Sequence, residues 1–289
     1  MPAPVPHIFD RRLLRARRRR AAPHFAAHDF LLRRAAEELD LRLSAITRRF
    51  PTALILGSFG GLLRDYPAFK ERIDTSFMAD LAEAMLPKGT ARLIADEETL
   101  PLAPASLDLI VSLWGLHHVN DLPGALVQIR QALKPDGLFL AALPGGHTLD
   151  TLRNALLHAE TEISGGIGAH IHPFIALPDL AHLMQRAQFA LPVADIDTLT
   201  VNYADPHSLF ADLRGMGDTN ILTDRARILR RDVLARAWEL CKENGKTPIR
   251  FDLCYLTGWA HHESQQKPLA PGSATTRLAD ALKTTEHKI

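Results

Sequence analysis

The stretch Thr52 to Gly61, TALILGSFGG, constrains the fold more than any other part of the chain. Its apolar half has the length of a strand buried on both faces, and the glycines that follow it mark a tight turn. Glycine accepts positive φ angles and leaves backbone N–H groups uncovered, so such a turn before a helix can cradle a nucleotide. A tight turn that only connects the strand to the helix, without binding a ligand, would have the same sequence pattern. We therefore expect the first strand of an α/β sheet at Ala53 to Leu56.

Apolar runs and helical periods alternate along the rest of the chain. Six further strands are predicted at residues 72–80, 92–96, 107–116, 138–143, 193–203 and 250–256. Helices are predicted at residues 26–49, 121–133, 148–163 and 178–187. This alternation implies right-handed crossovers, and it predicts a doubly wound, mostly parallel, Rossmann-like sheet of seven strands.

Three segments divide the 289 residues. We expect a basic helical extension at residues 1–50, an α/β domain at 51–265 with a helical insert at about 205–248, and a loose tail at 266–289. The share of charged residues, 23%, is that of an ordinary globular protein. Cys241 and Cys254 are too few for a disulfide framework or a metal knuckle, and we expect both to be small buried residues.

The formal net charge of +1 argues against nucleic acid as a partner. Arg11 to Arg20 is the exception, with seven arginines in ten residues. The run suits the polar side of a helix, an arm that touches an acidic partner or a membrane surface, or an organelle leader. No apolar stretch approaches the roughly 20 residues of a membrane span, and no secretory signal is present. These patterns predict a soluble intracellular protein, cytoplasmic in a bacterium.

Acidic residues follow the predicted strands at one edge of the sheet, where open α/β sheets bind their ligands. Asp80 ends the second strand, about 20 residues after the glycine turn, which is the position that binds ribose hydroxyls. Capping of the next helix is an alternative role that would not prevent ribose binding. Asp96 ends the third strand and suits an exocyclic adenine amine. Because the chain lacks G-x-G-x-x-G, an adenosine-type ligand without phosphate fits better than a dinucleotide.

At family level, the sequence resembles class I S-adenosylmethionine-dependent methyltransferases. The landmarks are RFPTALILGSFGG, SFMADLAEAM, the acid pair in ADEETLPL, the LDLIVS strand and the LKPDG turn. The N-terminal IFDRRLLRARRRRAAPHF, the HIHPF loop, LRGMGDTN and LTGWAHHESQ resemble more narrowly the complex I assembly factors, relatives of the malonyl-carrier-protein methyltransferase of biotin synthesis. The resemblance covers about residues 8 to 275.

The resemblance implies a methyltransferase fold and S-adenosylmethionine as cofactor, in the bacterial cytoplasm or the mitochondrial matrix. It implies a protein or carrier-linked substrate and a respiratory complex I subunit as partner. The expected cofactor-binding residues are Gly57, Ser58, Gly60, Gly61, Asp80, Leu81, Asp96, Glu97 and Leu113. The expected substrate contacts are Trp114, His117, His172, Trp259 and His262. The tryptophans could instead fill the core, and His117 could bond to backbone.

The glycine turn departs from the family pattern D-L-G-C-G-R-G at two positions. Ile55 stands where the acid is expected, and Phe59 stands where the middle glycine is expected. The Phe59 ring would occupy space that the methionine part of the cofactor uses. Three functions therefore remain open: methyl transfer, hydroxylation of an arginine in a complex I subunit, as the family implies, and cofactor-free assembly of that complex.

The sequence predicts no metal site and no catalytic nucleophile. His170 with His172, and His261 with His262 and Glu263, contain the residue types of a non-haem iron site. Neighbouring histidines and histidines two apart do not share one helix face, and no ligand spacing appears. No Ser-His-Asp or Cys-His arrangement can be recognised from spacing.

Overall fold

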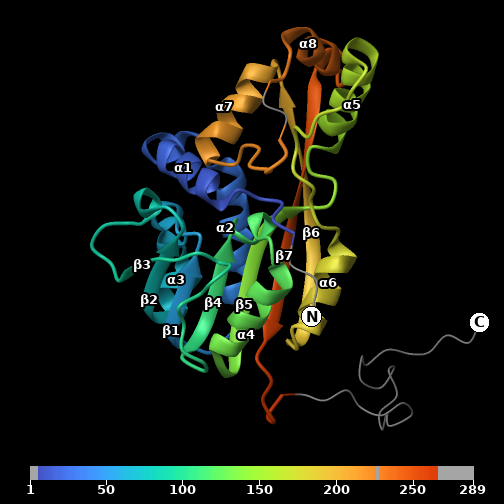
Figure 1. Ribbon diagram of the computed structural model, residues 1–289. Coiled ribbons are helices and arrows are strands. Elements are labelled where there is room, and N and C mark those ends of the chain that lie inside the picture. Colours follow the sequence, from blue (N-terminus) through green and yellow to red (C-terminus); the bar gives the residue numbers. More distant parts are fainter. Residues whose placement is uncertain (1–5, 226–227, 266–289) are drawn as a thin grey trace, which may run out of the picture.

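The computed structural model describes residues 6–225 and 228–265. It contains a seven-stranded sheet in the order β3-β2-β1-β4-β5-β7-β6 (Figure 1). The strands are β1 (Phe50–Leu56), β2 (Ile73–Asp80), β3 (Arg92–Ile94), β4 (Leu107–Leu113), β5 (Leu133–Gly145), β6 (Ala190–Tyr203) and β7 (Thr247–Trp259). The first five strands in this order, from β3 through β2, β1 and β4 to β5, are parallel. Strand β7 is antiparallel to both of its neighbours, β5 and β6. The predicted fold class and all seven predicted strands are confirmed.

Both faces of the central strands β1, β4 and β5 are buried, as their apolar sequences predict. In β1, Ala53 and Ile55 belong to one core, which includes residues of α2 (Phe30–Ser44) and α3 (Pro67–Arg72). Leu54 and Leu56 belong to the other core, with residues of α4 (Leu122–Ala132) and α6 (Leu177–Arg186). The alternation follows from the two-residue period of a strand, whose successive side chains point to opposite faces.

A helical lobe surrounds one end of the long strands β6 and β7, which extend past the parallel strands (Figure 1). It consists of α5 (Asp150–Ser164), α7 (Pro206–Met216) and α8 (Arg231–Leu240). Helices α7 and α8 fall inside the predicted insert at 205–248. Because α5 follows directly from the carboxyl end of β5, the lobe lies beside the edge of the sheet where the ligand is expected.

The N-terminal part contains two α-helices instead of the single predicted helix at 26–49. Helix α1 (Arg11–Ala21) begins at Asp10, whose carboxylate accepts a hydrogen bond from the backbone N–H of Leu13. A 3₁₀ helix, η1 (Ala22–Ala27), joins it to α2. Leu14 of α1 is fully buried, so the basic segment packs against the domain. The predicted tail at 266–289 lies outside the described residues.

No helix within residues 6–225 and 228–265 combines the length and the apolar character that crossing a membrane requires.

Candidate functional site

The turn after β1 adopts glycine conformations. Gly57, Gly60 and Gly61 have φ angles of 76°, 74° and 88°. A Cβ atom on Gly57 would lie 1.9 Å from the carbonyl oxygen of Leu113, at the end of β4. Glycine at position 57 therefore allows the turn to approach the neighbouring strand closely. The 3₁₀ helix η2 (Phe59–Asp65) overlaps this turn, and Gly60 and Gly61 have non-helical angles within it.

Asp80, the last residue of β2, lies buried beside this turn. Its carboxylate accepts hydrogen bonds from the backbone N–H of Ser58 at 3.1 Å and of Ala82 at 2.9 Å. Burial raises the pKa of Asp80, while the charge of Arg18 and the two N–H groups act in the opposite direction. The side chain thus connects the glycine turn to the end of β2, where ribose hydroxyls bind in folds of this class.

The side chain of Arg18, from α1, fills the space in front of Asp80. Its Nη1 lies 3.4 Å from Asp80 Oδ1, and its Nη2 donates a hydrogen bond of 2.9 Å to the carbonyl oxygen of Trp114. Its guanidinium carbon lies 4.9 Å from the centre of the Phe59 ring. Only 2% of Arg18 is exposed. An arginine of the chain itself therefore pairs with the carboxylate that is expected to bind ribose hydroxyls.

A second arginine of α1 pairs with the acids that follow β3. Nη2 of Arg11 lies 2.6 Å from Asp96 Oδ1 and also bonds to Glu97. Burial lowers the pKa of Arg11, but Glu97 and Asp96 outweigh this effect and the pKa is raised. The two acids expected on the adenine side are therefore already neutralised by α1. Helix α1 covers the edge of the sheet with two inward-pointing arginines.

Phe59 lies inside the turn rather than on the surface. It has a φ of 43°, which is uncommon for a residue with a side chain, and it is 2% exposed. Its ring stacks on Phe25 of η1 with ring centres 5.2 Å apart. Ile55, at the other departure from the family pattern, is buried in the core of the sheet. The turn thus presents an aromatic ring beneath Arg18 where the family pattern has a glycine.

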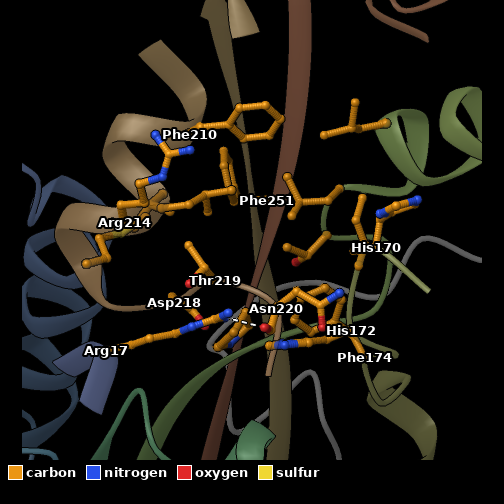
Figure 2. Close-up of a pocket in the computed structure, with 18 of the residues that line it drawn as sticks. Arg17, His170, His172, Phe174, Phe210, Arg214, Asp218, Thr219, Asn220 and Phe251 are labelled. Carbon is orange, nitrogen blue, oxygen red and sulfur yellow. Dashed lines mark hydrogen bonds between the residues drawn. The ribbon is translucent and has the colours of Figure 1, made fainter. Parts of the chain in front are cut away.

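A cavity of about 590 Å³ lies between the carboxyl end of the sheet and the helical lobe (Figure 2). This volume suits a small ligand or a substrate side chain. Its walls are mainly apolar and include Trp114, which follows β4, and Phe251 of β7. The polar and charged residues of the lining are Arg17, Arg20, Thr148, His170, His172, Arg214, Asp218, Thr219 and Asn220.

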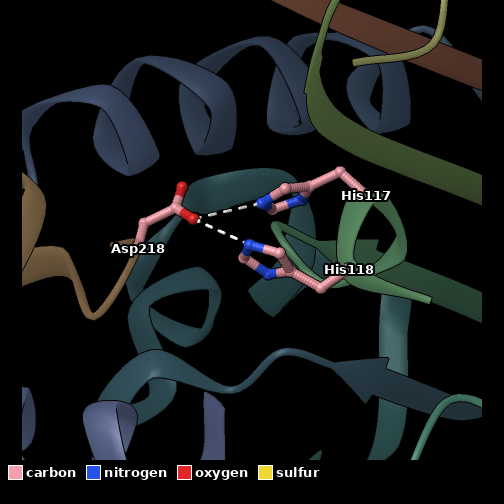
Figure 3. A group of neighbouring side chains, drawn as sticks. All are labelled: His117, His118 and Asp218. Carbon is pink, nitrogen blue, oxygen red and sulfur yellow. Dashed lines mark hydrogen bonds and ion pairs between the residues drawn. The ribbon is translucent and has the colours of Figure 1, made fainter. Parts of the chain in front are cut away.

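Two histidines and an aspartate meet beside the cavity (Figure 3). His117 and His118 belong to the 3₁₀ helix η4 (Leu116–His118), whereas Asp218 follows α7. Their Nε2 atoms lie 3.4 Å and 3.0 Å, respectively, from Asp218 Oδ1. Asp218 Oδ2 accepts a hydrogen bond of 2.8 Å from Nε1 of Trp114. The alternative that His117 bonds to backbone is not the arrangement observed, because its ring faces Asp218.

A third histidine, His172, lies next to this cluster, with its ring centre 5.0 Å from that of His118. Its Nε2 accepts a hydrogen bond of 2.8 Å from the backbone N–H of Ile221. Burial lowers the pKa of His172 to about 4 and holds the pKa of His118 well below its usual 6.5. Both imidazoles are therefore neutral near pH 7.

The structure brings most of the predicted site residues to one edge of the sheet. These are Gly57, Ser58, Gly60, Gly61, Asp80, Leu81, Asp96, Glu97, Leu113, Trp114, His117 and His172. Most of them lie at the ends of β1, β2, β3 and β4 or in the turns that follow these strands, and His172 lies in the connection between α5 and α6. The clustering follows from the parallel sheet, because parallel strands have their carboxyl ends at the same edge.

Trp259 and His262 lie elsewhere, which corrects their prediction as substrate contacts. Trp259 pairs with Leu138, the first residue of β5 that pairs with β7, and the guanidinium carbon of Arg48 lies 5.5 Å from the centre of the Trp259 ring. His262 is exposed and bonds to Ser264. The reason is the direction of β7, which is antiparallel to β5, so its last residues lie at the edge where the parallel strands begin.

Known proteins of similar sequence share nearly the whole length of this chain. The human protein named arginine-hydroxylase NDUFAF5, mitochondrial, is 41% identical over 287 residues, which cover 95% of this chain and 83% of the human protein. The chain belongs to the NDUFAF5 family. A malonyl-[acyl-carrier protein] O-methyltransferase of Xylella fastidiosa is 32% identical over 269 residues, covering 88% of this chain and 89% of that protein.

Within this NDUFAF5 family member, residues 56–141 match the model of a methyltransferase domain. The YcgJ protein of Bacillus subtilis covers 78% of the chain at a TM-score of 0.54 and 16% identity, with 99% of YcgJ included. A putative methyltransferase of Bacillus halodurans also covers 78%, at a TM-score of 0.56 and 13% identity, with 98% of that chain included. The fold is that of class I methyltransferases, and the chain is a methyltransferase-like protein.

Three residues of this NDUFAF5-family site were not predicted from the sequence: Arg11, Arg18 and Asp218. A signal for the arginines was present, because Arg11, Leu14 and Arg18 share one helix face at the spacing i, i+3 and i+7. An apolar residue between two arginines on that face indicates that the face packs against protein. Asp218 lies in LRGMGDTN, one of the segments that carried the family resemblance.

Proposed function

We propose that this chain binds S-adenosylmethionine at the carboxyl ends of β1, β2 and β3 and acts on a protein or carrier-linked substrate during respiratory complex I assembly. The observation that supports this most is Asp80. Its carboxylate is bonded to the N–H of Ser58 in the glycine turn and lies at the end of the second strand. The NDUFAF5 family and the match to a methyltransferase domain support the same function.

The residues fit the cofactor if the side chains of Arg18 and Phe59 both withdraw. The backbone of Gly57, Ser58, Gly60 and Gly61 would surround the methionine part, because the three glycines have no Cβ atoms in its way. Asp80 and Leu81 would face the ribose, and Asp96 and Glu97 the adenine, with Leu113 at the base of the site. The cofactor supplies an activated methyl group on a sulfonium.

The chain's own contribution to the reaction would be positioning. Trp114 and His172 line the cavity, and His117 lies beside it, so these side chains would orient the acceptor group. The mainly apolar walls would exclude water from the reacting atoms. No side chain of the site needs to form a covalent intermediate in such a transfer.

The partner and location are proposed on the same basis. The resemblance to complex I assembly factors supports a complex I subunit as partner. The mammalian relatives are named as mitochondrial proteins, so we propose the mitochondrial matrix as location, or the cytoplasm in a bacterium. On α1, Arg12, Arg15 and Arg19 are exposed, in contrast to Arg11 and Arg18. This outer face would allow a peripheral contact with an anionic membrane surface.

Calorimetric titration with S-adenosylmethionine and its demethylated product tests cofactor binding directly. We expect saturable heat for the wild type and a loss of about 1–3 kcal/mol in binding free energy for Asp80→Ala, because a charge-assisted hydrogen bond to the ribose is lost. Asp74→Ala, which removes an exposed carboxylate from the same strand, is the matched control. Absence of heat at millimolar ligand would contradict the proposal.

Arg18 and Phe59 favour a second function, assembly of complex I without the cofactor. Both side chains are buried where the cofactor would lie, and Arg18 satisfies Asp80 without it. The substitution Phe59→Gly distinguishes the two functions. If only Phe59→Gly binds S-adenosylmethionine, the wild-type site has lost its ligand and the second function holds. If the wild type binds equally well, the second function loses its main support.

The names of the relatives also support hydroxylation of an arginine on the partner. Intact-mass spectrometry of a candidate subunit after incubation with the chain separates the two reactions. Hydroxylation adds one oxygen atom, whereas methylation adds one CH₂ group. A product that carries the methyl group of isotopically labelled cofactor would exclude hydroxylation as the activity.

A further inference from the structure

The cluster of His117, His118 and Asp218 has the spacing of ligands around a metal ion. Metal–ligand bonds of about 2.1 Å and bond angles between 90° and 110° place neighbouring ligand atoms about 3.0–3.4 Å apart. The two Nε2 atoms lie 3.4 Å and 3.0 Å from Asp218 Oδ1. One ligand atom from each of the three residues falls within 4.8 Å of the others. Figure 3 shows both rings directed at the same carboxylate.

The hydrogen bonding of the cluster is incomplete within the described ranges. His118 is 1% exposed, yet neither of its ring nitrogens has a hydrogen-bond partner there. Within these ranges its Nε2 has only the 3.0 Å contact with Asp218 Oδ1, which is the geometry of an ion pair. Nδ1 of His117 also lacks a partner among these residues. Buried polar atoms without partners are costly and uncommon. Of these nitrogens, His118 Nε2 is the one that faces Asp218, so a partner is missing at the position between them.

The surroundings of Asp218 support a ligand role for its carboxylate. Trp114 Nε1 donates to Oδ2, which orients the carboxylate and leaves Oδ1 directed at the imidazoles. Such orienting bonds are typical around metal ligands. Arg17 interacts electrostatically with Asp218, but its guanidinium donates to the carbonyl oxygen of Asn220 instead. The guanidinium of Arg17 therefore does not occupy the position between His117, His118 and Asp218.

We propose that His117, His118 and Asp218 bind one divalent transition-metal ion of the Zn²⁺ and Fe²⁺ class. Two imidazoles and one carboxylate are a ligand set for these ions rather than for Mg²⁺ or Ca²⁺, which take mainly oxygen ligands. Three protein ligands leave at least one coordination position open. Asp218 lines the cavity, so an open position on that side would accept water or an oxygen atom of a substrate.

Titration of the untagged full-length chain with Co²⁺ tests the site. Co²⁺ is a spectroscopic substitute for Zn²⁺, because its visible absorption reports nitrogen and oxygen ligands. After removal of metal with a chelator, we expect one equivalent of Co²⁺ to bind saturably and to be displaced by Zn²⁺. His118→Gln and Asp218→Asn should each weaken binding by more than about 10-fold, since each removes a ligand. This readout uses no S-adenosylmethionine, so its failure would leave the proposed function untouched.

His172→Gln is the matched control. His172 is buried beside the cluster, but its Nε2 already accepts the N–H of Ile221, so this variant should keep the affinity. Imidazole resonances of the wild type provide a measurement that depends on no variant. Zn²⁺ should shift those of His117 and His118 and leave that of the exposed His262 unchanged. Several weak sites, no stoichiometric binding, or binding that survives both ligand substitutions would overturn the proposal.

Discussion

At the scale of single residues, the site contains a buried ion pair between two side chains of this chain, Arg18 and Asp80. Arg18 and Asp80 come from α1 and β2, and both are almost completely buried. Each charge is tolerable in the interior because the other is present. The same carboxylate that would bind a ribose is therefore also the anchor of the N-terminal helix.

Removing Arg18 should destabilise the protein strongly. Arg18→Met leaves the Asp80 carboxylate buried without a cation, and loss of one partner of a buried pair costs about 3–5 kcal/mol. Urea unfolding of the free protein measures this change. Arg19→Met, on the exposed side of the same helix, should change stability by less than about 0.5 kcal/mol. Equal stability of the two variants would show that the pair has no structural role.

The glycine at position 57 allows a second prediction at this scale. Gly57→Ala should destabilise the fold by more than about 1 kcal/mol, because the residue has a positive φ and its Cβ would overlap the carbonyl oxygen of Leu113. Gly166→Ala is the matched control, since an added Cβ would have no atom within 4 Å there and the residue does not have a positive φ. Thermal melting of both variants gives the comparison.

At the scale of elements, the antiparallel strand β7 connects the sheet to the helical lobe. Asp252 lies within β7, and its side chain is completely buried. Its carboxylate accepts hydrogen bonds from the N–H of His147 at 2.8 Å and from the hydroxyl of Thr198 on β6 at 2.9 Å. It thereby joins β7 to β6 and to the loop that follows β5.

This arrangement predicts an acid-dependent part of the stability. Burial raises the pKa of Asp252, but hydrogen bonds from Arg250, His147 and Thr198 outweigh it, and the pKa lies below its usual 3.8. For an acid with a lowered pKa, the stabilisation is present above pH 3.8 and is lost as the pH falls through the folded-state value. Unfolding free energies of wild type and Asp252→Asn, measured between neutral and acid pH, should therefore converge as the pH falls. A constant difference would contradict this assignment.

At the scale of the whole molecule, sheet and lobe share the larger of the two cores that cover the faces of the sheet. Cys241, at the end of α8, and Cys254, in the middle of β7, are both buried, as predicted. Burial raises their pKa values to about 11 and about 12. The two thiols thus report on opening of the lobe and of the sheet, respectively.

Neither thiol should react with a disulfide reagent in the folded protein at neutral pH. Both the burial and the raised pKa values keep the reactive thiolate scarce. In denaturant both should react fully, and absorbance of the released chromophore counts them. Rapid labelling of Cys241 under native conditions would show instead that the lobe opens independently of the sheet.

The sequence by itself determined the sheet, its seven strands, the glycine turn and the acid at the end of β2. These features depend on local periods and on the shared direction of parallel strands, which can be recognised from spacing alone. Only the tertiary structure decided that Arg11 and Arg18 point inward, that Trp259 lies at the opposite edge, and that Asp218 meets His117 across about a hundred residues. Those outcomes depend on how elements that are distant in the sequence pack together. A local sequence pattern does not indicate which residue will pair with a buried charge.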